Sequence, residues 1–451
     1  MTRLEALRAA HAHLLARRFE AALAAARPHA ADPAGALLHA LSLAGTGEID
    51  RAAPLLARIA AANPGANHPV QDLLPLLPPD QAAPHLRAAL RHRPDDTRLL
   101  TLLATTLADQ GPIEEAVETF RRLTTLRPSD AAAWSNLAKC LAAQARFPEA
   151  DAAFDTASRL APADARIAYN RAVMLLKAGR YAEGWPALQA RHRLPNRPKP
   201  LPSPRLQDLD IAGRTLLLLH DEGFGDTIQF IRYAKPLAAL GARVVAAMPA
   251  ALTRLVATAP RIAEVTTLPS LPAHDLWSPL LDIPALFGPP LPAETPYLAA
   301  PNSAVPLPPG RKIGLVWAGD PKGLLDPIRS LPINVLTPLG ALPGITWISL
   351  QKGITPPPWL HDPMPQVRDF ADTAAIIAQL ECVVAADTAV AHLAAALGKP
   401  VLLLDRYDNC WRWLSARTDT PWYPTLRILR QPAPGDWPSV VAQLGAMLAP
   451  E

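Results

Sequence analysis

Residues 381–404, ECVVAADTAVAHLAAALGKPVLLL, place a helix-forming segment between two short apolar runs. The first run, residues 382–386, contains β-branched side chains, and residues 389–397 have the composition of a helix. Gly398 and Pro400 then end that helix, and the second apolar run follows at once in residues 401–404. This order predicts a strand, a turn, a helix and a second strand, which together form a βαβ unit of a parallel sheet.

Polar residues stand where the first of these strands ends. Ligands of parallel sheets bind beyond the carboxyl ends of the strands, and Asp387 and Thr388 occupy that place. His392 lies four residues after Thr388 and therefore on the same helix face. The N–H groups and the positive dipole of a helix start suit a phosphate. The stretch predicts a phosphate site, and the alternative is that Asp387 and Thr388 only cap the helix while His392 packs inside.

Composition limits the class of protein. A chain of 451 residues that is 50% apolar can form two or three domains with sizeable cores. Its net charge of +4 comes without a Lys/Arg run, which makes a nucleic-acid partner unexpected. Cys140, Cys382 and Cys410 are too few and too scattered for a disulfide framework or a zinc site, which fits a reducing compartment. The amino terminus lacks a signal-peptide core and no apolar run spans a bilayer, so we expect a soluble cytoplasmic protein without a transmembrane segment.

The first third of the chain repeats itself. Pro94, Pro128 and Pro162 are spaced by 34 residues, and the apolar residues between them keep the same register. We therefore expect a helical repeat array over residues 1–194, clearest in 97–193, with degenerate helices of the same type before it. Such an array is either a spacer or a concave surface that binds a protein or peptide, and we favour binding.

A proline-dense linker, residues 195–205, ends the array, and short aliphatic runs alternating with helices follow it. The apolar run 215–220 leads into DEGFGDTIQF, where Gly223 and Gly225 allow a tight turn and the close approach of another molecule. Asp226 is expected to start a helix that ends near residue 241, either as its N-cap or as a carboxylate that faces a cleft. A third glycine is missing, which disfavours a nicotinamide dinucleotide.

A second proline-rich connector, residues 301–310, precedes the apolar run 312–317. The polar loop after this run contains Gly319, Lys322, Asp326, Arg329 and Ser330. A loop in this position can hold a diphosphate, with the guanidinium of Arg329 as a fork-shaped partner.

The order of HDEGFGDTIQFIRY, GLVWAGDPKGLLDPIRSLP, SLQKG, DFADTAAII, DTAVAHLAAALGKPV, WRWL and PWYP resembles the heptosyltransferase-like glycosyltransferases of family 9, and more closely those joined to tetratricopeptide repeats. The resemblance implies an α solenoid followed by an α/β GT-B fold with two Rossmann-like halves. Residues 206–309 would form the acceptor half and residues 310–451 the nucleotide-sugar half.

The resemblance also implies roles for particular residues. Asp226 matches the general base of the family. Asp387, Thr388 and His392 match the donor-phosphate and ribose motif of the family, and Arg329 stands about where family members often place a basic phosphate ligand. We expect Gly319 and Ser330 to bind the donor as well. The acceptor-side loop is formed by Glu222, Gly223, Phe224, Gly225 and Gln229.

The expected function is a hexosyl- or heptosyl-type glycosyltransferase, inverting and metal-independent. It would move a sugar from a nucleotide-diphosphate donor to a protein, peptide or glycan acceptor. No cofactor is expected, since the nucleotide sugar is a co-substrate. The alternative is a catalytically silent tetratricopeptide scaffold or a nucleotide-sugar-binding protein, and binding of nucleotide sugars would help to tell these apart.

Overall fold

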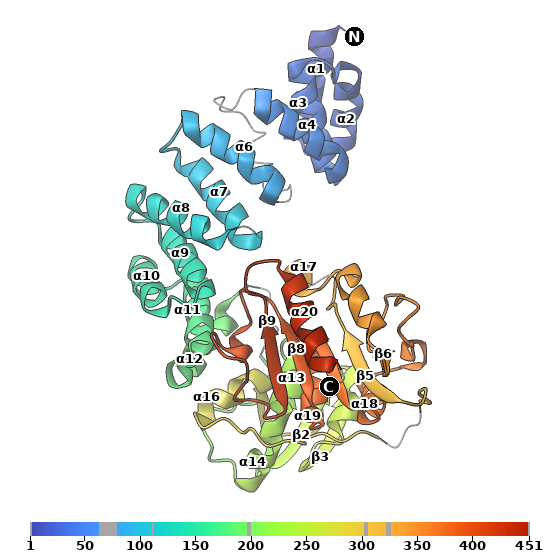
Figure 1. Cartoon of the computed structure of the whole chain (residues 1–451). Coiled ribbons are helices and arrows are strands. Elements are labelled where there is room, and N and C mark those ends of the chain that lie inside the picture. The colour runs from blue at the N-terminus through green and yellow to red at the C-terminus, as the bar shows by residue number, and fades with distance from the viewer. Residues whose placement is uncertain are drawn as a thin grey trace. The chain divides into compact units, whose positions relative to one another are not determined.

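The computed structural model describes residues 2–62, 79–110, 112–195, 200–301, 305–321 and 326–449, and divides into two compact units, Met1–Ile167 and Ala168–Glu451 (Figure 1). The described part of the first unit is helical, and the second unit contains two sheets. The helical array followed by a parallel-sheet α/β region confirms the expected fold class. The expected domain boundaries at residues 194, 205 and 309 stay a prediction, and part of the linker, 196–199, lies outside the described residues.

The helices of the first unit repeat with the predicted period. Helices α7, α9 and α11 begin at residues 97, 131 and 165, so each start follows the last by 34 residues. Helices α8, α10 and α12 begin at 113, 147 and 181 with the same spacing. The bounds are α1 (Arg3–Leu15), α2 (Phe19–Ala26), η1 (Arg27–His29), α3 (Pro33–Gly45), α4 (Ile49–Ala62), α6 (Pro79–His92), α7 (Thr97–Gln110), α8 (Ile113–Leu126), α9 (Ala131–Ala143), α10 (Phe147–Leu160), α11 (Ala165–Lys177) and α12 (Tyr181–Leu188).

Two ion pairs between neighbouring repeats are also spaced by 34 residues. Arg87 on α6 pairs with Glu115 on α8 at 2.6 Å, and Arg121 on α8 pairs with Glu149 on α10 at 2.7 Å. Adding 34 to both members of the first pair gives the second. Because α6 supplies the first arginine, the repeat register reaches back to α6, which sequence spacing left uncertain.

The second unit contains two parallel sheets, ordered β3-β2-β1-β4 and β6-β5-β7-β8-β9. Both sheets carry helices, as expected for two Rossmann-like halves. Strand β7 pairs in parallel with β8 across α19, which confirms the predicted βαβ unit. The strands are β1 (Thr215–Leu219), β2 (Arg243–Met248), β3 (Ile262–Thr267), β4 (Leu276–Pro279), β5 (Arg311–Val316), β6 (Ile345–Ser349), β7 (Cys382–Ala386), β8 (Val401–Asp405) and β9 (Leu426–Arg430).

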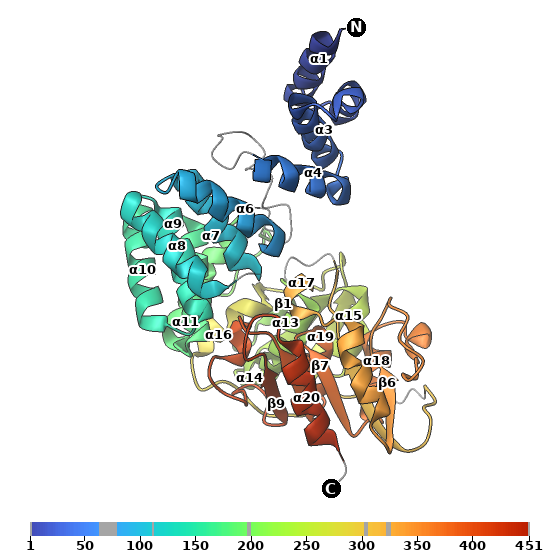
Figure 2. The same ribbon diagram turned by 45° about the horizontal axis from the view of Figure 1, so that its top comes forward.

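Helices cover both faces of the second sheet. Residues of α20 and η6 pack against one face, and residues of α18 and α19 pack in the core on the other (Figure 2). The helices of the α/β region are α13 (Phe224–Phe230), η4 (Ile231–Tyr233), α14 (Ala234–Ala239), α15 (Ala250–Val256), η5 (Leu280–Asp282), α16 (Ile283–Phe287), α17 (Asp326–Arg329), η6 (Ile333–Ala341), η7 (Met364–Gln366), α18 (Phe370–Ala378), α19 (Ala389–Ala396), η8 (Trp411–Trp413) and α20 (Trp437–Leu448).

The structure corrects two expectations about the first sheet. The single helix expected from Asp226 to residue 241 is three shorter helices, and its N-cap is Gly223, not Asp226. Pro236 lies in the last of them and cannot continue a regular hydrogen-bond ladder from the preceding turns. Strand β4 has no clear strand signal in the sequence, because its four residues end in Pro279 and show no alternation of apolar and polar side chains.

The end of the repeat-like helices belongs to the core of the second unit. Trp185 on α12 is fully buried, and its ring lies 5.8 Å from Phe230, 5.2 Å from Trp411 and 6.1 Å from Trp422, measured between ring centroids. A large aromatic side chain in such a cluster stabilises the fold by several kcal/mol, on the order of 3–5. Helix α12 is therefore part of the α/β unit as well as the last helix with the repeat period.

Candidate active site

A cleft of about 760 Å³ lies where the carboxyl ends of strands from both sheets meet. All the predicted site residues line it except Gln229 and Ser330. The structure therefore brings the acceptor-side loop after β1 together with the predicted donor residues after β5 and β7, although these groups are far apart in sequence. The lining residues among the predictions are Glu222, Gly223, Phe224, Gly225, Asp226, Gly319, Arg329, Asp387, Thr388 and His392.

Thr388 stands at the start of α19, but its side chain does not cap it. Its backbone has the extended conformation of an N-cap residue, with φ −135° and ψ 169°, yet its side chain makes no capping hydrogen bond. The hydroxyl oxygen is buried without a partner among the described residues. A buried hydroxyl without a partner is costly in a folded protein, so a ligand at this helix start that accepts or donates a hydrogen bond would satisfy it. Thr388 is thus the N-cap residue of α19 by its position and backbone, but its side chain does not make the capping hydrogen bond.

His392 follows one turn later and is both a core residue and a cleft residue. Its Nδ1 lies 2.9 Å from the Tyr423 hydroxyl, and its ring stacks on Trp413 at 5.1 Å. Burial, with the positive charges of Arg412 and Arg232, holds the pKa of His392 well below its usual value. The imidazole is therefore neutral at physiological pH, and Nε2 is the nitrogen left for a ligand.

The loop after β1 holds Asp226 in two contacts. Asp226 is the third residue of α13, and its Oδ2 accepts a hydrogen bond of 2.8 Å from the N–H of the N-cap residue Gly223. Its Oδ1 pairs with the guanidinium of Arg412, which comes from the loop after β8. The same guanidinium donates from Nε to Gln229 at 2.8 Å. Arg412 thus ties the loop after β8 to helix α13, and Gln229 supports this contact from outside the cleft.

Gly225 allows α13 to lie close to α19. A Cβ atom at this position would stand 3.0 Å from Cδ2 of His392 and 3.5 Å from Cα of Ala389. The expected close approach at this glycine is therefore made by the protein's own helix α19. Both Gly223 and Gly225 line the cleft, so a ligand that enters it meets bare backbone.

The loop after β5 is organised by Asp326. Ser330 donates to Asp326 Oδ1 at 2.8 Å and accepts from the N–H of Gly319 at 3.0 Å. The Arg329 guanidinium lies over Gly319, where a Cβ atom would stand 2.2 Å from Nη2, and its Nε contacts Asp326 at 3.3 Å. Ser330 thus shapes the turn and does not face the cleft. Lys322, expected in this loop, lies outside the described residues.

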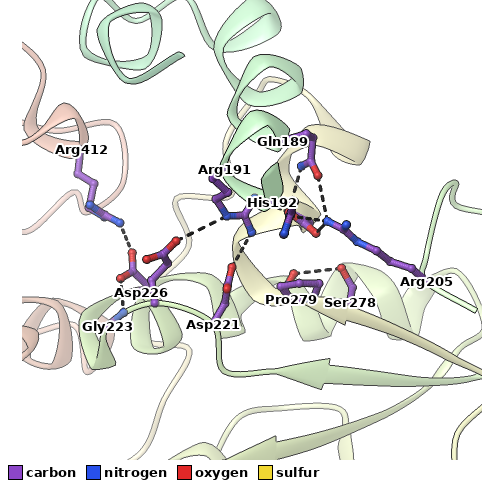
Figure 3. Close-up of polar contacts among 12 residues, drawn as sticks. Gln189, Arg191, His192, Arg205, Asp221, Gly223, Asp226, Ser278, Pro279 and Arg412 are labelled. Carbon is purple, nitrogen blue, oxygen red and sulfur yellow. Dashed lines mark hydrogen bonds and ion pairs between the residues drawn. The ribbon is translucent and has the colours of Figure 1, made fainter. Parts of the chain in front are cut away.

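A buried cluster of charges fixes the acceptor-side loop from behind (Figure 3). Arg191, which is 0% exposed, donates to Asp282 at 2.5 Å and to Asp221 at 2.6 Å, and its Nε lies 3.7 Å from Glu222. Burial alone would raise the pKa of Asp282, but His192, Arg191 and Arg205 together hold it well below its usual value. Asp221 and Glu222 directly precede Gly223, so this cluster anchors the turn that carries Asp226.

Sequence reasoning missed several charged residues of the cleft. Lys352 follows β6, Arg406 follows β8, and Arg412 lies in the same loop as Arg406. The rule that pointed to Asp387 and Thr388, a polar residue directly after a buried strand, also points to Arg406. Asp405, the residue before Arg406, is buried, and burial raises its pKa to about 7. The guanidinium of Arg430 lowers the pKa of Asp405, and the nearby Asp387 raises it.

The described residues contain neither a metal-binding cluster nor a membrane-spanning helix. Within residues 2–62, 79–110, 112–195, 200–301, 305–321 and 326–449, no three His, Cys, Asp or Glu side chains gather as a metal ion would require. Over the same ranges, every helix is too short or too polar to span a bilayer.

Two protein families match parts of the chain. The tetratricopeptide repeat family matches residues 79–140 and 113–174, and the glycosyltransferase family 9 (heptosyltransferase) family matches residues 368–430. The chain joins tetratricopeptide repeats to a family 9 glycosyltransferase domain. The family 9 match runs from α18 to β9 and contains Asp387, Thr388, His392, Arg406 and Arg412.

Relatives of both parts are similar at low identity. Protein FlbA of Caulobacter vibrioides is 25% identical over 312 residues, which cover 58% of this chain and 52% of that protein. The chain therefore matches about half the length of this relative.

Solved structures are similar to parts of this chain at low sequence identity. Heptosyltransferase II of E. coli is 13% identical, with 52% of this chain and 98% of that chain covered and a TM-score of 0.38. MamA (AMB-1) is 23% identical, with 36% of this chain and 93% of that chain covered and a TM-score of 0.32. YrrB, described as a TPR protein with an unusual peptide-binding site, is 20% identical, with coverages of 36% and 88% and a TM-score of 0.31.

Proposed function

We propose that this protein is a glycosyltransferase that moves a sugar from a nucleotide-diphosphate donor to a protein, peptide or glycan acceptor. The reaction inverts the anomeric centre and uses fixed protein charges in place of a metal ion. The donor binds at the start of α19 against Asp387, Thr388 and His392. The acceptor enters beside the loop of Asp226.

One observation carries this proposal: a carboxylate after the first strand of one sheet and an unsatisfied helix start after β7 of the other line the same cleft. A sugar hydroxyl attacks an anomeric carbon best when a carboxylate accepts its proton, and this is the role of Asp226. The departing diphosphate needs N–H donors and positive charge, which the first turn of α19 and the arginines of the cleft supply.

Binding of nucleoside diphosphates tests the donor site. ADP, GDP, UDP and CDP at millimolar concentration are added singly, and at least one of them should raise the melting temperature of the full chain. Asp387→Ala with Thr388→Val should abolish that rise while the nucleotide-free melting temperature changes little, because the Thr388 hydroxyl has no protein partner to lose. An equal rise in wild type and double variant would reject the site.

The silent-scaffold alternative has one observation in its favour. Both carboxylate oxygens of Asp226 are engaged, one by Gly223 and one by Arg412, so neither is free to accept a proton in this conformation. Nucleotide sugars distinguish the two functions. An enzyme hydrolyses or transfers the bound sugar, whereas a scaffold binds the nucleotide sugar and returns it unchanged.

We further propose that the repeats bind the protein or peptide acceptor, or a partner that carries it. Tetratricopeptide arrays expose an extended surface, and a bound acceptor would then be tethered to the catalytic unit at high effective concentration. Loss of the array should therefore cost acceptor use more than donor binding.

A further inference from the structure

Among the described residues that line the cleft, five carry an arginine or lysine side chain, and these five differ in whether another part of the protein already pairs with them. Arg412 pairs with Asp226, and Arg368 donates to Asp372 at 2.9 Å. Lys352 donates to the carbonyl of Val367 at 2.5 Å. Each of these cations has a partner before any ligand arrives, and so does the fourth, Arg329, through Asp326.

Arg406 is different. It lines the cleft and is 9% exposed, yet its guanidinium makes no hydrogen bond or ion pair with any residue in the described parts of the chain. A guanidinium carries five N–H donors, and no described residue accepts a hydrogen bond from those of Arg406, although most of the residue is buried at the wall of the cleft. The protein therefore maintains at this point a charged group that its own contacts do not explain.

The backbone on both sides of Arg406 is held in place. The N–H of Gln431 donates to the carbonyl of Asp405 at 3.0 Å, and the N–H of Tyr407 donates to Oε1 of Gln431 at 3.0 Å. Asp405 ends β8, which pairs directly with β7, and Thr388 starts the helix that follows β7. Arg406 thus lies at the same edge of the sheet as Thr388, whose hydroxyl has no partner among the described residues. The hydrogen bonds of Gln431 hold the backbone on both sides of Arg406 in place.

We propose that Arg406 binds the diphosphate of the nucleotide donor, together with the Thr388 hydroxyl and the first N–H groups of α19. The inference rests on the proposed function and makes it more specific, because it assigns the main cationic contact to Arg406 instead of Arg329. A planar guanidinium matches two phosphate oxygens at once. The positive charge of Arg406 also lowers the pKa of the neighbouring Asp405, against the effect of burial.

Calorimetric titration of the full chain with the nucleoside diphosphate that stabilises it, and with inorganic pyrophosphate, tests this inference. Arg406→Gln should weaken both by about tenfold or more, the loss expected for a charge-assisted contact. Arg406→Lys keeps the charge and should recover part of the affinity. The matched control Arg427→Gln, at an exposed arginine of β9 that does not line the cleft, should bind as the wild type does.

Each outcome has a distinct meaning. A wild type that binds a nucleoside diphosphate and an Arg406→Gln variant that binds it equally well would overturn the inference and leave the proposed function standing. A wild type that binds neither nucleoside diphosphates nor pyrophosphate would overturn both. Binding of pyrophosphate alone, weakened in Arg406→Gln, would keep Arg406 as a diphosphate ligand and reject the nucleotide donor. Melting curves without ligand show whether the variants are folded, and Arg406→Lys replaces any variant that is not.

Discussion

At the scale of single residues, the contact between Asp226 and Arg412 decides how the cleft can work. Gly223 and Arg412 occupy the two carboxylate oxygens, so an acceptor hydroxyl must replace one of them before Asp226 can take its proton. Arg412 is the more exchangeable partner, because the cleft that it lines can also contain donor phosphate, whereas the Gly223 contact belongs to the helix start. In the proposed mechanism Asp226 therefore keeps one oxygen on the N–H of the N-cap residue Gly223 and uses the other as the base.

Replacing Asp226 by asparagine separates these roles. Asparagine can still accept from the Gly223 N–H but can neither take a proton nor balance Arg412. We expect sugar transfer to fall about a hundredfold or more, with nucleotide affinity retained. The free energy of unfolding should fall by about 1–3 kcal/mol, since a charge-assisted contact is lost. Initial rates, calorimetry and denaturant unfolding measure the three effects. Transfer at the wild-type rate would remove Asp226 from the mechanism.

His392 should make stability depend on pH in a predictable direction. Burial first, and then Arg412 and Arg232, lower its pKa in the folded state, whereas the unfolded chain has the ordinary value near 6.5. Below pH 6.5 the unfolded state binds a proton that the folded state does not, so the stability is complete above that pH and is lost as the pH falls.

A comparison with His392→Gln isolates this effect from other titrating groups. Glutamine can still reach the Tyr423 hydroxyl but does not titrate. The advantage of the wild type over the variant in unfolding free energy should be larger at pH 7.5 than at pH 5.5, as measured by chemical unfolding. A difference that stays constant between the two pH values would show that His392 does not titrate on unfolding in this range.

At the scale of secondary structure, the packing of α13 on α19 joins the two halves of the site. A Cβ atom on Gly225 would come within 3.0 Å of His392, which the Trp413 ring and the Tyr423 hydroxyl hold in place. The His392 ring therefore cannot move aside without losing these contacts, so an added Cβ atom would push α13 and α19 apart. Because both helices begin at the cleft, their separation would change the distance between Asp226 and the donor site.

Gly225→Ala should consequently lower the free energy of unfolding by about 1–3 kcal/mol, as overpacking does, and should weaken nucleotide binding. Gly445→Ala is the matched control, because Gly445 lies within α20 and an added Cβ meets no atom within 4 Å. There the same substitution should raise stability by about 0.5–1 kcal/mol. Melting temperatures and titrations measure both effects, and equal behaviour of the two variants would show that the packing at Gly225 is not tight.

At the scale of the whole molecule, the compact units and the sequence repeats do not end at the same residue. Trp185 and Arg191, which the repeat pattern assigns to the array, are buried in the unit that begins at Ala168. Arg191 neutralises Asp282 and Asp221 there. A truncation meant to test the array must therefore leave α11, α12 and η3 (Gln189–Arg193) in place.

Two truncated chains test this division. A chain of residues 163–451 should fold and bind nucleotide as the full chain does, while it loses acceptor use if the array binds the acceptor. A chain of residues 194–451 lacks Trp185 and Arg191, so the aromatic cluster loses a ring and the buried Asp282 keeps Arg205 but loses the ion pair with Arg191. Its melting temperature should therefore fall sharply, or it should not fold. Melting curves and titrations of both chains decide the point, and equal stability of the two would contradict the assignment of α12 to the second unit.

The sequence by itself determined the features that local pattern encodes. The 34-residue period specifies the repeat helices, because each repeat has the same short-range signals. The composition of residues 381–404 specifies the βαβ unit, and the geometry of parallel strands then places Asp387, Thr388 and His392 at the ligand end. Most of the predicted site residues line one cleft for this reason.

Only the tertiary structure decided which charges meet. Asp226 and Arg412 are 186 residues apart in the sequence, and Arg191 and Asp282 are 91 residues apart. No repeat or local motif of the sequence indicates either pair. Whether a hydroxyl or a guanidinium finds a hydrogen-bond partner also depends on the residues around it in the folded protein. The sequence next to Thr388 and Arg406 therefore could not show that their side chains lack partners among the described residues. Local sequence pattern determines the helices and strands and where each begins and ends. Burial and contacts between distant residues determine which of these strand ends and helix starts form the candidate site.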